Sequence, residues 1–409
     1  KGVALYGLVV RNCPGRGMAI TADDVVVRGC RIHDTYQGAL IIGDSDGPIV
    51  RNVVFEDNVL TRMSQSWVTE TKPKGVNGGV NIHNVELVKF RYNVASDGWG
   101  EILNVGRGSK RVLVEGNILH SGNHVLAYLN RCQKCEFVGN ILFHVPDADY
   151  RNRDGEWSAG FVIGDERGRA VKNSPFSWGN VIRENVVVNT GVLLHVRNNT
   201  KETGGYDTQL LNTIVANNTL VGGPSTRAGI IIQPNMRGRK HAGSVFHHNV
   251  IDFSNAPKEA DIGTFSDGTG VKFEDNAWST RPPQTMQSKD DLYGVFLTNP
   301  AAAITRAKES VESRIDLDNY RPRPGALPEN MGALKVMEPP DEPPPDPPPA
   351  TGVDWAGLRT LADAARDAVD AADGATALAA GSLVSAAEAL KRANERLEEL
   401  VEQMDLYRE

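Results

Sequence analysis

Cysteine, aromatic residues and long apolar runs are all in short supply in this chain of 409 residues. Four cysteines are too few to predict a disulfide framework, and no apolar run reaches the ~18 residues that a membrane span needs. Cys132 and Cys135 form a single CxxC motif, but a zinc site needs two further ligands at a suitable spacing. Because no second pair is present, the sequence predicts neither a metal nor another cofactor.

The net charge of −7 conceals two parts of opposite sign. Residues 338–409 hold 16 acidic and 6 basic residues, a net charge of −10, so residues 1–337 carry +3. This is far below the basic footprint of a nucleic-acid-binding domain, and we do not expect a nucleic-acid partner. A mildly basic body is compatible with an acidic polysaccharide.

A short phrase recurs along the first two thirds of the chain, and residues 112–119, Val-Leu-Val-Glu-Gly-Asn-Ile-Leu, are its clearest copy. Before the Asn, each copy alternates apolar and polar residues, which is the period of a strand with one buried face. The Asn then supplies a residue that tolerates a left-handed bend. The residues that close the copies are Asn58, Asn93, Asn117, Asn140, Asn185, Asn218, Asn249 and Asn276, with Cys13 and Cys30 in two earlier copies.

The spacing of these Asn residues predicts a solenoid. The tightest intervals, 24 residues from Asn93 to Asn117 and 23 from there to Asn140, fit one coil of three short strands and turns. Stacked coils lie about 4.8 Å apart, so the side-chain amide of one Asn can hydrogen-bond to the Asn of the next coil. We therefore expect a buried polar column that satisfies itself by repetition.

This repeat resembles that of the right-handed parallel β-helix, or pectin-lyase-like, proteins over residues 1–334. The resemblance implies an all-β fold, a right-handed single-stranded parallel β-helix, and residues 318–333 look like the loop that often closes such domains. An uncapped first coil exposes strand edges, and no initiator Met or signal peptide precedes Lys1, so we expect an upstream segment or a partner chain there. The fold hosts polysaccharide lyases, glycoside hydrolases, epimerases, tailspikes and adhesins, so function must be argued from a site.

The composition of the chain changes twice beyond the repeats. We predict a β-helix over residues 1–337, an acidic, Pro-rich linker over 338–353 and an α-helical segment over 354–409. The last segment holds a coiled-coil seam with steps of four and three residues: Leu383, Ala387, Leu390, Asn394, Leu397, Val401 and Met404. The seam fits a partner helix in a homo-oligomer or larger assembly, and it fits an intrachain hairpin equally well.

A second family of strands lies between the Asn positions, and its period-2 pattern assigns an outward face. That face is polar except for Val162 and Ile231, and long insertions at residues 64–79 and 147–169 are placed to wall it. We therefore predict a solvent-facing glycan groove. The predicted substrate-binding residues are Asn81, His83, Asn104, Asn130 and Gln233 on the strands, with Trp67 and Trp157 in the insertions as sugar-stacking platforms or as packing residues.

Three residues of the same face are of the types that β-elimination of a uronate requires. Arg197 can neutralise the uronate carboxylate, a role that the amide of Asn104 or Asn130 can also fill. His195 can take the C5 proton, and Tyr128 can protonate the leaving oxygen. Glycoside hydrolysis needs two carboxylates across the scissile bond, and the outward stripe has none. The nearby carboxylates stand at strand ends or in loops: Asp97, Glu101, Asp165 and Glu166. If this chain is an enzyme, the sequence favours a lyase over a hydrolase.

The combination of a rigid rod, a polar face, a stiff spacer and a helical tail favours recognition over chemistry. We expect an extracellular, cell-surface or virion-associated protein, similar to tailspikes and adhesins, that binds a polysaccharide or cell-surface glycan, with or without depolymerising activity. Two alternatives stay open. One is a secreted polysaccharide lyase acting on an acidic, uronate-containing glycan, and the other is a purely structural surface or virion protein.

Overall fold

The computed structural model describes residues 2–66, 78–145, 157–166, 176–198, 208–234, 240–265, 269–294, 296–297, 320–323, 326–328 and 331–333. The chain divides into two compact units, Ala4–Pro339 and a second unit of Lys1–Val3 with Pro340–Glu409. Apart from Gly2 and Val3, every described residue belongs to the first unit. The predicted linker at 338–353, the predicted helices at 354–409 and Trp67 lie outside the described residues, so these interpretations remain predictions.

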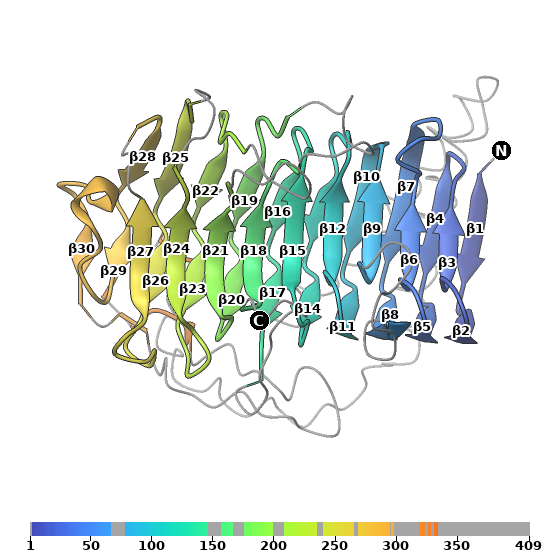
Figure 1. The fold of residues 1–409 in the computed structure, drawn as a ribbon, viewed down its shortest axis with the longest axis horizontal. Helices are drawn as coiled ribbons and strands as arrows, with labels where there is room; N and C mark the ends of the chain where they lie inside the picture. The colour runs from blue at the N-terminus through green and yellow to red at the C-terminus, as the bar shows by residue number, and fades with distance from the viewer. Residues whose placement is uncertain are drawn as a thin grey trace, which may run out of the picture. The chain divides into compact units, whose positions relative to one another are not determined.

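Successive coils of the first unit contribute strands to three parallel sheets, which we name A, B and C in the order the chain visits them (Figure 1). Sheet A holds β1 (Val3–Tyr6), β4 (Val25–Arg28), β7 (Val50–Glu56), β10 (Val85–Arg91), β13 (Leu113–Glu115), β16 (Glu136–Val138), β19 (Val181–Arg183), β22 (Ile214–Ala216), β25 (Ser244–His247) and β28 (Val271–Glu274). Sheet B holds β2 (Val9–Cys13), β5 (Arg31–Thr35), β8 (Val59–Met63), β11 (Val94–Gly98), β14 (Ile118–His120), β17 (Ile141–Phe143), β20 (Val186–Val188), β23 (Thr219–Val221), β26 (Val250–Asp252), β29 (Ala277–Trp278) and β30 (Leu292–Tyr293).

Sheet C holds β3 (Met18–Ile20), β6 (Leu40–Ile42), β9 (Val80–His83), β12 (Leu103–Gly106), β15 (Val125–Asn130), β18 (Ala159–Ile163), β21 (Val192–Val196), β24 (Ala228–Ile232) and β27 (Asp261–Phe265). A short 3-10 helix, η2 (Gln284–Met286), lies near the end of the described coils. None of the described segments forms a helix long and apolar enough to cross a membrane. The predicted all-β, right-handed parallel β-helix is confirmed.

The inner faces of the three sheets meet in a core of aliphatic and aromatic side chains. Strand alternation sets which residues enter it: Val80 of β9 pairs in register with Leu103 of β12, and both are buried. Aromatic rings stack from coil to coil, as Phe55 does on Phe90 with ring centroids 5.5 Å apart. Each coil therefore buries its apolar face against its neighbours, which is how a solenoid builds a core.

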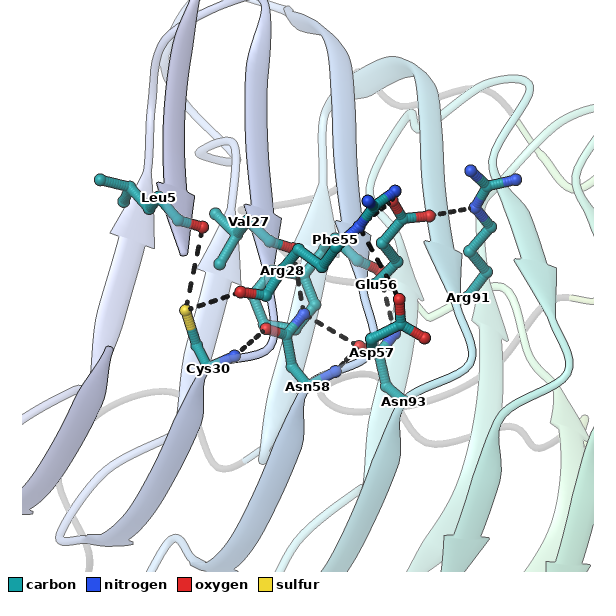
Figure 2. A network of polar contacts seen from close by, with 10 residues as sticks. All are labelled: Leu5, Val27, Arg28, Cys30, Phe55, Glu56, Asp57, Asn58, Arg91 and Asn93. Carbon is teal, nitrogen blue, oxygen red and sulfur yellow. Dashed lines mark hydrogen bonds and ion pairs between the residues drawn. The ribbon is translucent and has the colours of Figure 1, made fainter. Parts of the chain in front are cut away.

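A column of buried Asn side chains runs along the corner between sheets A and B, as the repeat predicts. From Asn58 to Asn249, the side-chain amide and the backbone N–H of each Asn both donate to Oδ1 of the next, over 2.9–3.0 Å, and the column reaches Asn276. The same side-chain nitrogen also donates to a backbone carbonyl of the preceding coil, as Asn58 does to Val27 O at 3.1 Å (Figure 2). The amides within the column are therefore satisfied by repetition.

The first end of the column differs from the prediction at Cys13. Cys30 does continue the column, because its backbone N–H donates to Oδ1 of Asn58 at 2.8 Å (Figure 2). Cys13 instead ends strand β2 and pairs in register with Thr35. Since Val9 pairs with the residue after Cys30, Leu8 holds the column position of that coil. The phrase around Cys13 imitates the repeat in sequence but is out of register with it.

At the other end, Asp291 closes the column, which the repeat did not predict. Its Oδ1 accepts from the backbone N–H of Asn276 at 2.9 Å, and its Oδ2 accepts from the backbone N–H of Ser288 at 2.8 Å. Burial raises the pKa of Asp291 in spite of these bonds. A carboxylate thus accepts the last backbone N–H where no further Asn is present.

The left-handed bend falls one residue before each Asn, whereas the sequence analysis placed it on the Asn itself. Positive φ angles occur at Asp57, Tyr92, Gly116, Gly139, Glu184, Asn217, His248 and Asp275. The preceding residue makes the turn because the Asn must keep its side chain pointed inward, where it hydrogen-bonds along the column. The sharp corner and the polar column are therefore assigned to two adjacent residues.

An ion-pair network crosses three coils beside the start of the column (Figure 2). Glu56 of β7 is 3% exposed and stands in register with Arg28 of β4 and Arg91 of β10. Arg28 Nε donates to Glu56 Oε1 at 2.8 Å, and Arg91 Nε donates to the other oxygen. Burial alone would raise the pKa of Glu56, but the hydrogen bonds from the two arginines hold it below its usual value. The carboxylate therefore links the outer surfaces of three coils.

Cys132 and Cys135 are both buried as free thiols near the corner between sheets C and A. The backbone N–H of Cys135 donates to Asn180 Oδ1 at 3.0 Å, and Asn180 Nδ2 donates to the carbonyl oxygen of Cys132 at 3.0 Å. Asn180 therefore satisfies backbone groups at this corner much as the column does at the other. Across the described ranges, no group of three or more His, Cys, Asp or Glu side chains is placed to hold a metal ion.

Candidate functional site

The predicted site residues share the outward face of sheet C. Register pairing places Asn81 of β9 beside Asn104 of β12, and Asn104 beside Tyr128 of β15. The same row continues through Val162 on β18, His195 on β21 and Ile231 on β24. A second row, nearer the carboxyl ends of the strands, holds His83, Asn130, Arg197 and Gln233.

This face is buried, whereas the sequence analysis predicted a solvent-facing stripe. His83 is 1% exposed, Tyr128 2% and Asn130 0%. Tyr128 and Val162 belong to a cluster of buried apolar side chains on the outer face, separate from the main core. Strand alternation assigns a side chain to a face but does not say whether that face is covered, so the expectation of exposure was wrong.

The long insertions of the sequence all adjoin sheet C. Segments 67–77 and 146–156 precede β9 and β18, and segments 167–175, 199–207 and 235–239 follow β18, β21 and β24; these five lie outside the described residues. By contrast, only two residues separate each strand of sheet A from the next strand of sheet B. Insertions on one face of a solenoid commonly mark its binding face, so the connectivity favours function on sheet C.

Six buried polar atoms on or beside this face make no well-aligned hydrogen bond within the described part of the chain, although the side chains of His83 and Asn104 are near enough to interact. They are Asn81 Oδ1, both ring nitrogens of His83, Asn104 Oδ1, Arg107 Nε and His195 Nε2. Leaving such a group unpartnered costs about 1–3 kcal/mol, so folded proteins contain few of them. Their concentration on one face makes this face the candidate functional site. We call these atoms the unpartnered set.

Both histidines of the unpartnered set are neutral. Burial lowers the pKa of His195 to about 3, with the charge of Arg197 adding to the effect. Burial likewise lowers the pKa of His83 to about 3, with a further contribution from Arg107, whereas the neighbouring side chain of Asn104 acts to raise this pKa. Arg197 Nε donates to His195 Nδ1 over 3.4 Å, so the ring proton of His195 is on Nε2. His195 thus offers a donor, and its predicted role as a base would need Arg197 to release Nδ1.

Arg197 also connects the face to a carboxylate that precedes β12. Its Nη1 lies 3.3 Å from His124 Nε2, and His124 Nδ1 lies 3.5 Å from Glu101 Oε1. Because a guanidinium only donates, His124 accepts at Nε2 and directs its Nδ1 proton toward Glu101. Burial alone would raise the pKa of Glu101, but His124 and Arg197 hold it below its usual value. Glu101 is therefore ionised at neutral pH and offsets the charge of Arg197.

A second carboxyl group approaches from the opposite end of the strands. Glu166 follows β18, its Oε2 accepts from Asn130 Nδ2 at 2.9 Å, and its backbone N–H donates to Asn130 Oδ1 at 3.2 Å. Burial raises the pKa of Glu166, and the negative charge of Glu101 raises it further. The two carboxyl groups are therefore near enough to interact, and their environments shift their pKa values in opposite directions.

Comparison with protein families agrees with this architecture. Residues 2–142 match the family model for the right handed beta helix region. Three parallel sheets and the Asn column extend the same coil well beyond that match. The described coils form a right-handed parallel β-helix. No curated protein sequence matches it.

Solved structures similar to this β-helix protein are distant in sequence. XylC in complex with xylose is 10% identical with a TM-score of 0.40, and the match covers 71% of this chain and 52% of that one. The Dettilon tailspike protein is 12% identical with a TM-score of 0.39, covering 72% and 60%. Pectate lyase Pel9A is 12% identical with a TM-score of 0.36, covering 80% and 88%. The chain thus spans less than two thirds of the first two, and none of these similarities assigns it a function.

Besides Asn130, whose side-chain amide pairs with Glu166, three further predicted site residues of the β-helix are engaged by protein groups. Tyr128 Oη donates to Gly164 O at 3.1 Å, so a role as an acid would require that bond to break. Gln233 Oε1 accepts from the backbone N–H of Asn198. Trp157 is half-buried, and the guanidinium of Arg227 lies over its ring, 4.7 Å from the ring centroid. The remaining strand residues, from Asn81 to Arg197, make up the better-supported part of the site.

Four charged or titratable residues of the site were not among its predicted members: Glu101, Arg107, His124 and Glu166. Each stands just beyond the end of a sheet C strand of the β-helix. The period-2 pattern assigns faces only within strands, which is why Glu101 and Glu166 were noticed as strand-end carboxylates but were not placed. The signal that could have found them is the clustering of charged residues at the ends of one set of strands.

Proposed function

We propose that the outer face of sheet C binds a glycan and that the chain is a glycan-recognition β-helix. The observation that carries this is the mixed chemistry of the unpartnered set. Asn81 Oδ1 and Asn104 Oδ1 only accept hydrogen bonds, and His195 Nε2 and Arg107 Nε donate them. Neutral His83 offers one nitrogen of each kind. A hydroxyl group donates and accepts at once, so a polyhydroxylated ligand satisfies the whole set.

Other ligand classes fit the unpartnered set less well. A fully ionised anion accepts but does not donate, so it would leave the Asn oxygens unpartnered. An apolar ligand would leave every atom of the set unpartnered. Buried water can satisfy both kinds of group, and it is the structural alternative in which the face holds water and binds nothing else.

The extent and charge of the face favour an oligosaccharide with acidic groups. From β9 to β21 the face crosses five strands, and four steps of about 4.8 Å give it a length of about 19 Å. Arg107 and Arg197 lie along it, and only Glu101 is held ionised beside them. A uronate carboxylate would restore the balance of charge, which is consistent with the predicted role of Arg197.

The proposed biological setting is extracellular, on a cell surface or on a virion, as for tailspikes and adhesins. Homo-oligomerisation through the predicted helices at 354–409 would raise the avidity of weak single sites. An acidic-polysaccharide lyase using Tyr128, His195 and Arg197 is the alternative, because the last two are in direct contact on this face. A purely structural role corresponds to the water-filled alternative.

The binding proposal is tested with the full chain on a panel of acidic and neutral polysaccharides, followed by calorimetry on any that binds. Asn104→Leu removes an unpartnered acceptor and should weaken binding about tenfold, the equivalent of one hydrogen bond. Thr213→Val is the matched control, because Thr213 Oγ1 is also buried and unpartnered but lies at the corner before sheet A. Equal affinity of wild type and Asn104→Leu, or no binding across the panel, would contradict the proposal.

A further inference from the structure

Two carboxyl groups flank the proposed glycan face from opposite ends of its strands. Glu101 lies just before β12, at the amino end of sheet C, and Glu166 lies just after β18, at the carboxyl end. A glycan that follows the stacking direction of the coils therefore passes between them. Hydrolysis of a glycosidic bond needs an acid and a base group on either side of it, and the charge of Glu101 reaches Glu166 across this face.

Both carboxyl groups keep an oxygen that no described protein group uses. Glu101 directs Oε1 toward His124, and Glu166 accepts from Asn130 through Oε2. The side chain of Glu101 is 15% exposed and Glu166 is also partly exposed, whereas Asn130 between them is 0% exposed. The carboxyl groups of Glu101 and Glu166 are thus accessible, whereas the side chain of Asn130 between them is buried.

The other two strand-end carboxylates of the sequence do not fit the same role. Asp165 is 0% exposed, and it accepts hydrogen bonds from the backbone N–H and the hydroxyl of Ser177. Asp97 belongs to β11 of sheet B and is away from the glycan face. Of the four carboxylates that the sequence singled out, the structure therefore retains Glu101 and Glu166.

We infer that Glu101 and Glu166 hydrolyse a glycosidic bond of the glycan held on sheet C, with Glu166 as the general acid and Glu101 as the general base. The inference rests on the proposed glycan binding. Glu166 gives its proton to the glycosidic oxygen while the bond from that oxygen to the anomeric carbon breaks, and the electron pair stays on the oxygen. A water molecule bonds to the anomeric carbon through its oxygen and gives a proton to Glu101. One water is consumed, and exchange with solvent then returns both carboxyls to their starting states.

The electrostatics of the pair support this division of roles. Burial and the charge of Glu101 raise the pKa of Glu166, which favours the protonated form that an acid needs. His124 and Arg197 hold the pKa of Glu101 below its usual value, which favours the ionised form that a base needs. Two carboxyls with oppositely shifted pKa values are what such acid and base chemistry requires. The sequence analysis favoured a lyase over a hydrolase because it placed no pair of carboxylates on this face. The pair of Glu101 and Glu166 reverses that preference.

The pH dependence of kcat/KM follows from the same directions. Activity rises with pH as Glu101 loses its proton below the usual range of a Glu, and falls as Glu166 loses its proton above that range. The groups that act on Glu101 are His124 and Arg197, and those that act on Glu166 are Glu101, Asn130, Arg107 and His124. The result is a bell-shaped profile, and Glu166→Gln should lack its alkaline limb.

The test incubates the full chain with the glycan identified by binding, and follows both new reducing ends and the absorbance of unsaturated uronate. Reducing ends should form without that absorbance. Glu101→Gln and Glu166→Gln should each lower the rate at least ~100-fold while binding is kept. Glu136→Gln is the control, because Glu136 is exposed on sheet A and its removal should leave the rate unchanged.

The outcomes separate this inference from the binding proposal. Unsaturated products, full activity in either Gln variant, or a wild-type chain that binds the glycan without releasing reducing ends would each overturn the hydrolytic pair and leave glycan binding standing. Failure of the wild type to bind any glycan would instead defeat the proposed function. If Glu101→Gln does not fold, the pH profile of the wild type is compared with that of Glu166→Gln. Loss of the alkaline limb in the variant supports the hydrolytic pair, and its retention contradicts the pair.

Discussion

The Asn column and the outer face of sheet C hold buried polar side chains in opposite ways. In the column, each Asn meets an identical residue one coil away, and donors and acceptors match by symmetry. On sheet C, successive coils present different residues, and several polar atoms have no protein partner among those described. Asn117 is fully hydrogen-bonded in the first setting, whereas Asn104 has an unpartnered Oδ1 in the second. Repetition closes a polar network, and departure from repetition leaves buried polar atoms without a matching protein group among the described residues.

The energetic consequences of the two arrangements differ in sign. A closed network stabilises the coils that share it, because removing one member leaves its neighbours buried and unsatisfied. An open set lowers stability by about 1–3 kcal/mol for each unpartnered group, and folded proteins keep such groups chiefly at functional sites. The same substitution, Asn to Leu, should therefore act differently in the two regions.

The largest expected effect is at the column. Asn117→Leu removes Oδ1, which accepts from the backbone N–H and the side-chain amide of Asn93. It also removes Nδ2, which donates to Phe90 O and to Asn140 Oδ1. We expect the free energy of unfolding to fall by about 1–3 kcal/mol, measured by denaturant unfolding monitored by circular dichroism. A change below about 0.5 kcal/mol would show that the column contributes little and would remove one side of the comparison.

A smaller effect is expected from Asn104→Leu on sheet C. Asn104 Oδ1 makes no well-aligned hydrogen bond with the described residues and interacts only with neutral His83, so replacing Asn104 with an apolar group of similar size should change the free energy of unfolding by less than about 1 kcal/mol. The same denaturant series, run without ligand, measures it. Destabilisation as large as that of Asn117→Leu would mean that Asn104 belongs to a closed network and that the face is not open.

The smallest effect concerns Asp291 and appears only as a dependence on pH. Because burial raises its pKa, the folded chain binds a proton that the unfolded chain releases, so stability falls as pH rises from the usual Asp value through the raised one. Asp291→Asn cannot titrate and should lack this component, so the difference in stability between the variant and wild type should grow across that window. Parallel stability curves from pH 3 to pH 7 would contradict the assignment.

The parts of the fold that repeat could be predicted from the sequence. The column from Asn58 to Asn276 and the outward positions on sheet C follow from a period that recurs coil after coil. Cys13 shows the limit of this reasoning, because a phrase that looks like the repeat can be out of register with it. The position of the left-handed bend was also missed, since adjacent residues share the corner and only the backbone shows which one turns.

The parts that do not repeat could not be predicted in the same way. Whether His83 and Tyr128 are exposed depends on what lies over the strands, and the repeat carries no information about that. Glu101 and Glu166 stand outside the strands, where alternation no longer fixes a direction. Their pairing depends on the positions of His124 and Asn130 in other coils, so the candidate site emerged only from the three-dimensional arrangement.

The most direct test of glycan binding at the unpartnered set is the effect of the bound glycan on the stability of the chain. The bound glycan, added at about 100 times its dissociation constant, should raise the free energy of unfolding of the wild-type chain by about 2.7 kcal/mol. If the unpartnered set contacts the glycan, Asn104→Leu should show a clearly smaller increase at the same concentration and Thr213→Val the full one. Equal stabilisation of all three proteins would contradict the account, because the glycan would then bind without contacting the unpartnered set on sheet C.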